Sequence, residues 1–390
     1  MSEWQELTLG EITEPVKNTY LPTSNEQLAY VGLEHIEQET LRLTGVGKSS
    51  DVTSNKFKFE VNDVLFGKLR PYFRKVYKPK FSGICSTDIW VFRAKKGFVQ
   101  DFLFYFLASW DFVDTANSGE GGTRMPRADW NFLKTTSWLV PCEEEQQKAI
   151  ASVLSSLDDK IDLLHRQNTT LERMAETLFR QWFVEEAHED WEEKPLGDVI
   201  ETTSGGTPSR SNMDFYVNGS INWVKSKELS GSFILDTEEK ITTEALKKSS
   251  AKLLPKNSVL IAMYGATVGE YAIISKEMTC NQAVCALKPS EKYPYTFLFL
   301  YVKSYQDELI NMAVGSAQQN ISQLLIKQLP VPTCYEKISE FHQKTEPFFE
   351  KIKNNILQIQ TLEKLRDNLL PKLMSGDVRV VLQAESALNA

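Results

Sequence analysis

Hydrophobic residues recur at alternating intervals of four and three positions over a long run near the middle of the chain. The run begins at Ile150 and ends at Trp182, and neither proline nor glycine interrupts it. This spacing is typical of a helix that packs against another helix along one narrow stripe. A helix from about residue 143 to 183 would be roughly 60 Å long at 1.5 Å per residue, too long for the interior of one small domain. The predicted seam consists of Ile150, Leu154, Leu157, Ile161, Leu164, Asn168, Leu171, Ala175, Leu178 and Trp182.

A second run with the same spacing lies near the end of the chain. Its seam consists of Phe341, Thr345, Phe348, Ile352, Asn355, Ile359, Leu362, Arg366, Leu369 and Leu373. A narrow apolar stripe is not stable in water, so we expect the two helices to pack against each other. One antiparallel register matches every seam position and places Asn168 opposite Asn355, a pair that would fix the register at some cost in stability. The alternative is two amphipathic helices in separate cores.

The repetition extends into the segments that precede the helices. The sequence WQELTLGEI at residues 4–12 returns as WEEKPLGDV at residues 191–199, and VLFG at residues 64–67 parallels VLIA at residues 259–262. An internal duplication sets the architecture of the whole chain. We therefore predict a first globular domain at residues 1–142, a first long helix at 143–186, a second globular domain at 187–333, a second long helix at 334–378 and a loose polar tail at 379–390.

Each globular domain combines two kinds of segment. Short β-rich runs such as residues 89–92 and 259–263 are separated by Gly, Asn and Pro, whereas residues 102–109 and 295–305 are typical of aromatic-rich helices. The predicted fold class is α+β: two similar domains joined by two long helices packed as an antiparallel coiled coil, with a pseudo-twofold internal repeat.

Composition excludes several classes of protein. The chain has 390 residues, 42% hydrophobic and 25% charged, which is ordinary for a globular protein. Its five cysteines include no CxxC pair, which argues against a zinc site, and we expect no metal. No segment approaches the about 18–20 apolar residues that a membrane span needs, so we expect a cytoplasmic protein.

The net charge of −8 is unevenly distributed. Residues 56–96 contain eleven Lys or Arg against three acidic residues. Within this range Lys68, Arg70, Arg74 and Lys75 flank two aromatic residues, and a basic cluster of this kind can neutralise phosphates and contact guanine. The alternative is a solvated edge strand with two aromatic residues in the core.

Polar loops supply the other candidate nucleic-acid contacts. A Gly-hinged loop at residues 121–127 contains two arginines, and an amide-rich loop at 315–322 takes its place in the second half, where paired amides could bind adenine. A Gly-rich turn at 205–210 could bind phosphate through backbone N–H groups, or be a simple tight turn. The candidate residues in these segments and their neighbours are Thr123, Arg124, Arg127, Thr207, Ser209, Arg210, Lys225, Lys227, Tyr264, Gln318, Gln319 and Asn320. For each, the alternative is an ordinary polar surface residue.

Catalytic motifs are not convincing in this sequence. The stretch GVGKS at residues 45–49 lacks the first glycine of a P-loop, because Arg42 occupies that position. No methyltransferase motif of the DPPY or NPPY type and no G-x-S-x-G occurs, and no carboxylate pair or His/Cys set recurs in both halves. Catalysis by this chain is therefore doubtful.

Several motifs in one order resemble the specificity (S) subunit of type I restriction–modification enzymes. They are the repeated start at 191–199, GTPS at 206–209, INWV at 221–224, GTRMPR at 122–127, LFRQWF at 178–183 and LLPKLMSGDVR at 369–379. The resemblance covers about residues 4–380, and its specificity lies in the order and duplication of the motifs. The first domain departs from the pattern because it lacks the Gly-Gly-Thr-Pro loop, so contacts there cannot be transferred from the second domain.

The resemblance implies a non-catalytic DNA-recognition role. Each globular domain would be a target recognition domain for one half of a split double-stranded DNA site, and the two helices would measure the spacer between the halves. Two modification (M) subunits, which hold S-adenosylmethionine and methylate adenine, would dock on the helices. Restriction (R) subunits, which use ATP and Mg, would join them, leaving this chain without a cofactor. The alternatives are a self-contained DNA-modifying enzyme and a coiled-coil scaffold protein.

Overall fold

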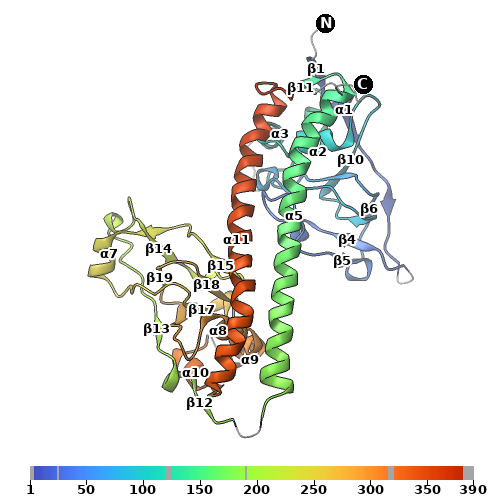
Figure 1. The fold of residues 1–390 in the computed structure, drawn as a ribbon. Coiled ribbons are helices and arrows are strands. Elements are labelled where there is room, and N and C mark those ends of the chain that lie inside the picture. Colours follow the sequence, from blue (N-terminus) through green and yellow to red (C-terminus); the bar gives the residue numbers. More distant parts are fainter. Residues whose placement is uncertain (1–3, 24–25, 119–124, 189–190, 315–319, 381–390) are drawn as a thin grey trace, which may run out of the picture. The chain divides into compact units, whose positions relative to one another are not determined.

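The structure is a computed structural model that describes residues 4–23, 26–118, 125–188, 191–314 and 320–380 (Figure 1). The chain forms two compact units, and each is described by itself. The first comprises residues 1–162 with 360–390, and the second comprises residues 163–359. Two long helices, α5 (Glu144–Arg180) and α11 (Tyr335–Met374), each contribute one part to each unit.

The first unit is a mixed α/β domain packed against parts of both long helices. Its strands are β1 (Trp4–Thr8), β2 (Thr13–Pro15), β3 (Thr19–Tyr20), β4 (Ala29–Val31), β5 (Gly47–Lys48), β6 (Lys56–Phe59), β7 (Val64–Gly67), β8 (Val76–Tyr77), β9 (Gly83–Cys85), β10 (Ile89–Ala94) and β11 (Ser137–Pro141). Its shorter helices are α1 (Leu9–Ile12), α2 (Gln100–Ala108), α3 (Trp110–Ser118) and α4 (Trp130–Leu133). The strands pair in the orders β1-β11, β2-β10-β7-β8 and β3-β6-β9-β4-β5.

The second unit repeats this plan. Its strands are β12 (Glu193–Pro195), β13 (Thr202–Ser204), β14 (Ile221–Val224), β15 (Phe233–Ile234), β16 (Lys240–Ile241), β17 (Val259–Ala262), β18 (Tyr271–Ile274), β19 (Thr279–Cys280), β20 (Val284–Leu287) and β21 (Pro330–Pro332). Its shorter helices are α6 (Leu196–Val199), α7 (Thr243–Lys248), α8 (Tyr295–Ser304), α9 (Gln306–Val314) and α10 (Gln323–Gln328). The order β13-β20-β17-β18-β15 repeats β2-β10-β7-β8 with one added strand, and β12-β21 repeats β1-β11. The prediction of two similar domains is confirmed.

The aromatic helices α2 and α8 lie at the centre of the two units. Every residue of α8 from Tyr295 to Val302 is buried, and so is every residue of α2 from Phe102 to Ala108. A helix that is apolar on all sides is stable only when it is covered on all sides. The sheet covers one side of each helix and the long helices cover the other, so the aromatic helices connect each sheet to the helix pair.

The seam of the long helices was correctly predicted. In each helix seven of the ten predicted positions are buried and three are half-buried, in the same order along both helices. Within each unit the two helices run side by side in opposite directions (Figure 1). In the second unit, Asn355 Nδ2 donates to Asn168 Oδ1 over 2.8 Å, and the rings of Trp182 and Phe341 lie 5.9 Å apart. The predicted register, with Asn168 opposite Asn355, is confirmed.

No helix in the described part of the chain is long and apolar enough to cross a membrane.

The buried asparagine pair allows a stability test. Asn355 is fully buried and Asn168 is 8% exposed. We expect Asn355→Leu to lower the free energy of unfolding by about 1–3 kcal/mol, because the Asn168 amide would stay buried without its partner. The double variant Asn168→Leu/Asn355→Leu removes both amides and should regain most of this loss. Chemical denaturation followed by circular dichroism measures both effects.

The neighbouring residue Asn354 provides the matched control, because it lies on the same helix and is exposed. Asn354→Leu should leave the denaturation midpoint close to that of the wild type. The interpretation fails if Asn355→Leu is as stable as the wild type, or if the double variant is less stable than both single variants.

Candidate nucleic-acid interface

Two segments that are distant in the sequence meet at the end of strand β7 in the first unit. Leu69 and Arg127 form an isolated antiparallel bridge, Arg70 N donates to the Pro126 carbonyl over 2.8 Å, and Ala128 N donates to the Lys68 carbonyl over 2.9 Å. The basic loop at residues 68–75 and the end of the Gly-hinged loop therefore lie side by side.

The second unit builds the same junction from different residues. Tyr264 and Asn320 form the equivalent bridge after strand β17, and Ile321 N donates to the Met263 carbonyl over 2.9 Å. Each bridge is followed by a short helix with a polar N-cap, Asp129 before α4 and Ser322 before α10. Arg127 and Asn320 therefore occupy equivalent places in the two frames.

The two loops after β7 and β17 have equal length and left-handed residues at equivalent positions. They connect strand pairs of equal register, because Phe66 pairs with Val76 and Ile261 pairs with Tyr271. The first loop has left-handed residues at Arg70 (φ 52°) and Arg74 (φ 46°), and the second has them at Gly265 (φ 72°) and Gly269 (φ 83°). Glycine adopts this conformation freely, whereas a residue with a side chain pays about 1–2 kcal/mol. For Arg74, the side-chain contacts to Ala108 and Asp367 offset this cost.

The predicted basic cluster separates into half-buried and buried members. Lys68, Arg70 and Lys75 are half-buried. Lys68 Nζ lies 6.0 Å from the centre of the Trp90 ring, and burial lowers the pKa of its ammonium group. Lys75 Nζ donates to the Leu33 carbonyl over 2.5 Å, and burial likewise lowers its pKa.

The prediction that Arg74 contacts nucleic acid needs correction. Its side chain is only 1% exposed, and its guanidinium donates to the Ala108 carbonyl over 2.6 Å and pairs with Asp367 over 3.2 Å. Its carbon Cζ lies 5.2 Å from the centre of the Trp110 ring. Because every face of the guanidinium is occupied inside the first unit, Arg74 cannot reach a phosphate.

In the second unit, acidic side chains hold most of the predicted cations. Arg210 pairs with Glu239 over 2.6 Å and lies 4.3 Å from the centre of the Tyr216 ring. Lys225 contacts both Glu238 and Glu239 over 2.9 Å, and its side chain is 15% exposed. Lys227 contacts Glu238 over 2.8 Å. To bind phosphate, these cations would have to exchange carboxylates for phosphate oxygens. The sequence prediction missed these carboxylates, whose only sequence signal is the adjacent pair of glutamates.

The remaining candidates fall into three groups. Thr207 and Ser209 form hydrogen bonds to Gln282 and Ser211, respectively. Tyr264 is 43% exposed, and Arg127 forms an ion pair of 3.0 Å with Asp88. The candidates outside the described residues are Thr123, Arg124, Gln318 and Gln319. Within the described ranges, no group of three or more His, Cys, Asp or Glu residues could hold a metal ion.

Comparison with known proteins identifies this arrangement. A sequence model of the family described as type I restriction modification DNA specificity domain matches residues 1–173 and 188–361, which are the two halves of the repeat. The chain belongs to this family. It is a specificity subunit of the type I restriction–modification class, and DNA binding follows from that membership.

Individual relatives support the assignment over most of the chain. The MjaIX specificity subunit of Methanocaldococcus jannaschii is 29% identical over 73% of this chain and 71% of its own length. The HindI specificity subunit of Haemophilus influenzae is 23% identical over 97% of this chain and 100% of its own length. The crystal structure of a type I S subunit from M. genitalium has a TM-score of 0.59 at 16% identity, covers 95% of this chain and 96% of its own, and shows the same fold.

The ion pairs of Glu238 with Lys225 and Lys227 predict a pH-dependent contribution to the stability of this specificity subunit. Hydrogen bonds from Lys225 and Lys227 lower the pKa of Glu238 to about 2. Because the folded-state pKa is below the ordinary value of about 4.3, the contribution is complete above that value and is lost as the pH falls toward 2. We expect Glu238→Gln to unfold at a lower temperature than the wild type at pH 7, with a difference that shrinks as the pH falls below about 4.3.

Thermal unfolding from pH 7 downward measures this difference. Glu277→Gln, which changes an exposed glutamate of the same unit, is the control. A difference between Glu238→Gln and the wild type that stays constant with pH would contradict the assignment of the ion pairs.

Proposed function

We propose that each domain of this specificity subunit reads one half of a two-part DNA site, and that the paired helices set the distance between the halves. The main support for this function is that the two domains have equivalent backbone junctions that carry different side chains. The Leu69–Arg127 and Tyr264–Asn320 bridges hold equivalent loops of different chemistry. Arginine can fork onto guanine, whereas asparagine can pair with adenine, so equal frames with unequal residues favour two different half-sites.

Residues at the two junctions are the proposed DNA contacts. In the first domain they are Lys68, Arg70 and Arg127, which lie around the Leu69–Arg127 bridge. In the second domain Tyr264 and Asn320 have the equivalent places. Phosphate contacts would orient each domain, and side chains that reach base edges would supply the sequence preference.

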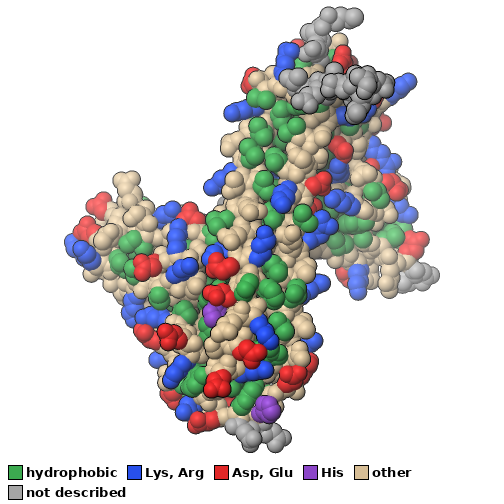
Figure 2. Space-filling view, in the orientation of Figure 1, with side chains coloured by type: hydrophobic (Ala, Val, Ile, Leu, Met, Phe, Trp, Pro, Cys, Tyr) green, Lys and Arg blue, Asp and Glu red, His purple; other side chains and the backbone are tan. Residues whose placement is uncertain are grey.

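Partner subunits would carry out DNA methylation and cleavage. Two M subunits would supply S-adenosylmethionine and methylate adenine, and R subunits would use ATP and Mg to translocate and cut DNA in the cytoplasm. Support comes from apolar side chains on the outer faces of the long helices. Leu163 and Met174 of α5 are 40% and 46% exposed, and Leu357 and Leu365 of α11 are 46% and 44% exposed. Figure 2 shows hydrophobic side chains exposed along the long helices, a surface suited to docking of a protein subunit.

The arginines of the first junction can be tested through salt dependence. We expect Arg70→Gln and Arg127→Gln each to weaken DNA binding by the complex with M subunits. A phosphate contact would reduce the slope of log affinity against log salt by about 0.9, whereas a base contact would relax preference at one position at a cost of about 1–3 kcal/mol. Fluorescence anisotropy with site and non-site duplexes at several salt concentrations separates the two roles.

The control is Lys276→Gln, which removes an exposed cation of the second unit outside both junctions and both long helices and should leave the affinity unchanged. If Arg70→Gln and Arg127→Gln both bind like the wild type, the first junction is not a DNA contact. DNA cleavage or methylation by the purified chain without partners would instead indicate a self-contained enzyme.

The role of the helices can be tested by changing their length. One heptad inserted after Asp162 and one after Ile359 would lengthen both helices at the boundary of the two units, leaving the contacts within each unit intact. Seven residues add about 10 Å, which is roughly three base pairs. We expect both half-sites to be retained with about three more base pairs between them.

Sequencing of methylated adenines in cells that contain the variant and its M subunits gives the new spacer. Insertion of five residues at both places is the control, because it turns each seam by about 140° away from its partner and should abolish assembly. Methylation at an unchanged spacer in the heptad variant would refute the proposed role of the helices.

A further inference from the structure

The contact between each domain and the long helices differs sharply between the two units. In the first unit this contact, called the first joint, consists of Arg74, Tyr105, Ala108, Asp158, Arg366 and Asp367. Arg74 donates to the Ala108 carbonyl of α2 over 2.6 Å and pairs with Asp367 of α11 over 3.2 Å. The loop that carries the candidate DNA contacts is therefore directly linked to helix α11.

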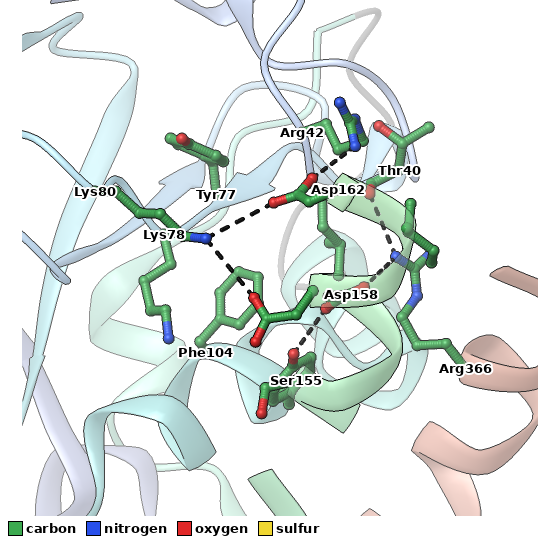
Figure 3. A pocket seen from close by; sticks show the side chains of 14 residues that line it. Thr40, Arg42, Tyr77, Lys78, Lys80, Phe104, Ser155, Asp158, Asp162 and Arg366 are labelled. Carbon is green, nitrogen blue, oxygen red and sulfur yellow. Dashed lines mark hydrogen bonds and ion pairs between the residues drawn. The ribbon is translucent and has the colours of Figure 1, made fainter. Parts of the chain in front are cut away.

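A second buried arginine completes the first joint. Arg366 is 2% exposed, pairs with Asp158 over 2.9 Å and with Asp367 over 3.2 Å, and Tyr105 Oη donates to Asp158 over 2.7 Å. Figure 3 shows Asp158 turned toward Arg366, with the ion pair between Arg42 and Asp162 beside them. Two buried arginines face two half-buried aspartates, so each guanidinium has a carboxylate that offsets the cost of burying its charge.

The internal repeat identifies the equivalent positions in the second unit. Phe102 stacks on Phe106 in α2, and Phe297 stacks on Tyr301 in α8, which aligns the two helices. The equal loops align Arg74 with Gly269, and the matching seams align the long helices. The residues equivalent to Arg74, Tyr105, Ala108, Asp158, Arg366 and Asp367 are Gly269, Leu300, Lys303, Phe349, Ala175 and Glu176.

The second joint, formed by these equivalent residues, is mostly apolar. The ring of Phe349 makes edge contacts with Tyr295 and Phe299 at 5.8 and 5.5 Å. One ion pair remains, between Lys303 of α8 and Glu176 of α5. A Cβ at Gly269 would lie 2.7 Å from Ile310 Cγ1, so a side chain there would require Ile310 to move. In the first unit, Arg74 of the loop forms the ion pair with the long-helix carboxylate Asp367. In the second unit, Lys303 of the aromatic helix α8 forms the equivalent ion pair with Glu176.

We infer that Arg74 is a positioning residue, which holds the 68–75 loop of the first domain on helix α11, whereas the second domain is held by a link that bypasses its loop. This role explains why an arginine occupies a left-handed position that carries a glycine in the other repeat. The effect of Arg74 on DNA recognition rests on the function proposed above, whereas its role in holding the loop on helix α11 does not.

Transplanting the second arrangement into the first unit tests this inference in the full chain. Arg74→Gly keeps the left-handed backbone but removes the link. It should lower the melting temperature and accelerate hydrogen exchange of the amides at residues 67–76 by about tenfold or more. Arg74→Gly/Ala108→Lys places a lysine where α8 has Lys303, opposite Asp367. The double variant should recover melting temperature without recovering the slow exchange of the loop.

Two further variants keep the test decisive. Arg70→Gly is the matched control, because it changes the other left-handed arginine of the same loop, and it should alter neither the melting temperature nor loop exchange. Asp367→Asn removes the ion pair with little change of shape, and it should accelerate loop exchange even if the transplanted lysine fails to restore stability. Unchanged loop exchange in both Arg74→Gly and Asp367→Asn would overturn the inference, as would full recovery of slow exchange in the double variant.

A DNA readout separates the positioning role from a merely structural one. In the complex with M subunits, Arg74→Gly and the double variant should both raise the KM for DNA, while Lys303→Met should lower the melting temperature without raising that KM. An equal rise in KM for Lys303→Met would overturn the claimed difference between the domains. If the wild-type complex fails to bind DNA, the proposed function fails, but the loop exchange still decides the role of Arg74.

Discussion

The antiparallel packing of two heptad stripes is the interaction on which the rest of the structure depends. The two long helices have 37 and 40 residues, and each has a single apolar stripe. Such a helix is not stable alone in water, so each packs against the other. Apolar side chains alone would permit several registers that differ by one heptad. The hydrogen bond between Asn168 and Asn355 selects one of them, because any other register would bury two amides without partners. The sheets and aromatic helices are then built on a helix pair whose register is already fixed.

Duplication of the domain separates the frame from the surface it presents. The backbone contacts at the Leu69–Arg127 and Tyr264–Asn320 bridges are the same in kind, although the side chains differ completely. Backbone hydrogen bonds carry no side-chain information, so loops can change without loss of the frame. Buried residues such as Leu133 and Ile326, which follow the N-caps of α4 and α10, show the opposite behaviour and stay apolar in both units. A specificity subunit needs this combination of constant support and variable contact.

The sequence predicted those features that are periodic or duplicated. The seam, its register and the repeated domains follow from regular spacing, which depends on neighbours three or four residues away and on one partner helix. The role of Arg74 could not be predicted in this way. Its neighbours Lys68 and Arg70 are also cations and belong to the same loop. Arg74 differs from them in its ion pair with Asp367, a residue far along the chain. The same holds for Lys225, whose carboxylate partners come from the chain segment before β16. Ion pairs between distant segments have no periodic signal.

The two joints also explain why each domain suits its own place on the helices. Tyr105 of the first domain donates its hydroxyl to Asp158 of α5. The residue of α11 that is equivalent to Asp158 is Phe349. If the first domain sat on the helix surfaces of the second, this hydroxyl would be buried against an aromatic ring, at a cost of about 1–3 kcal/mol. The second domain placed on the first surface would bring Leu300 against Asp158 and leave that half-buried carboxylate with one partner fewer. The polar joint and the apolar joint therefore each favour their own domain, although the two domains are built on nearly the same frame. A recognition domain acquired by exchange would have to match the joint as well as the DNA site.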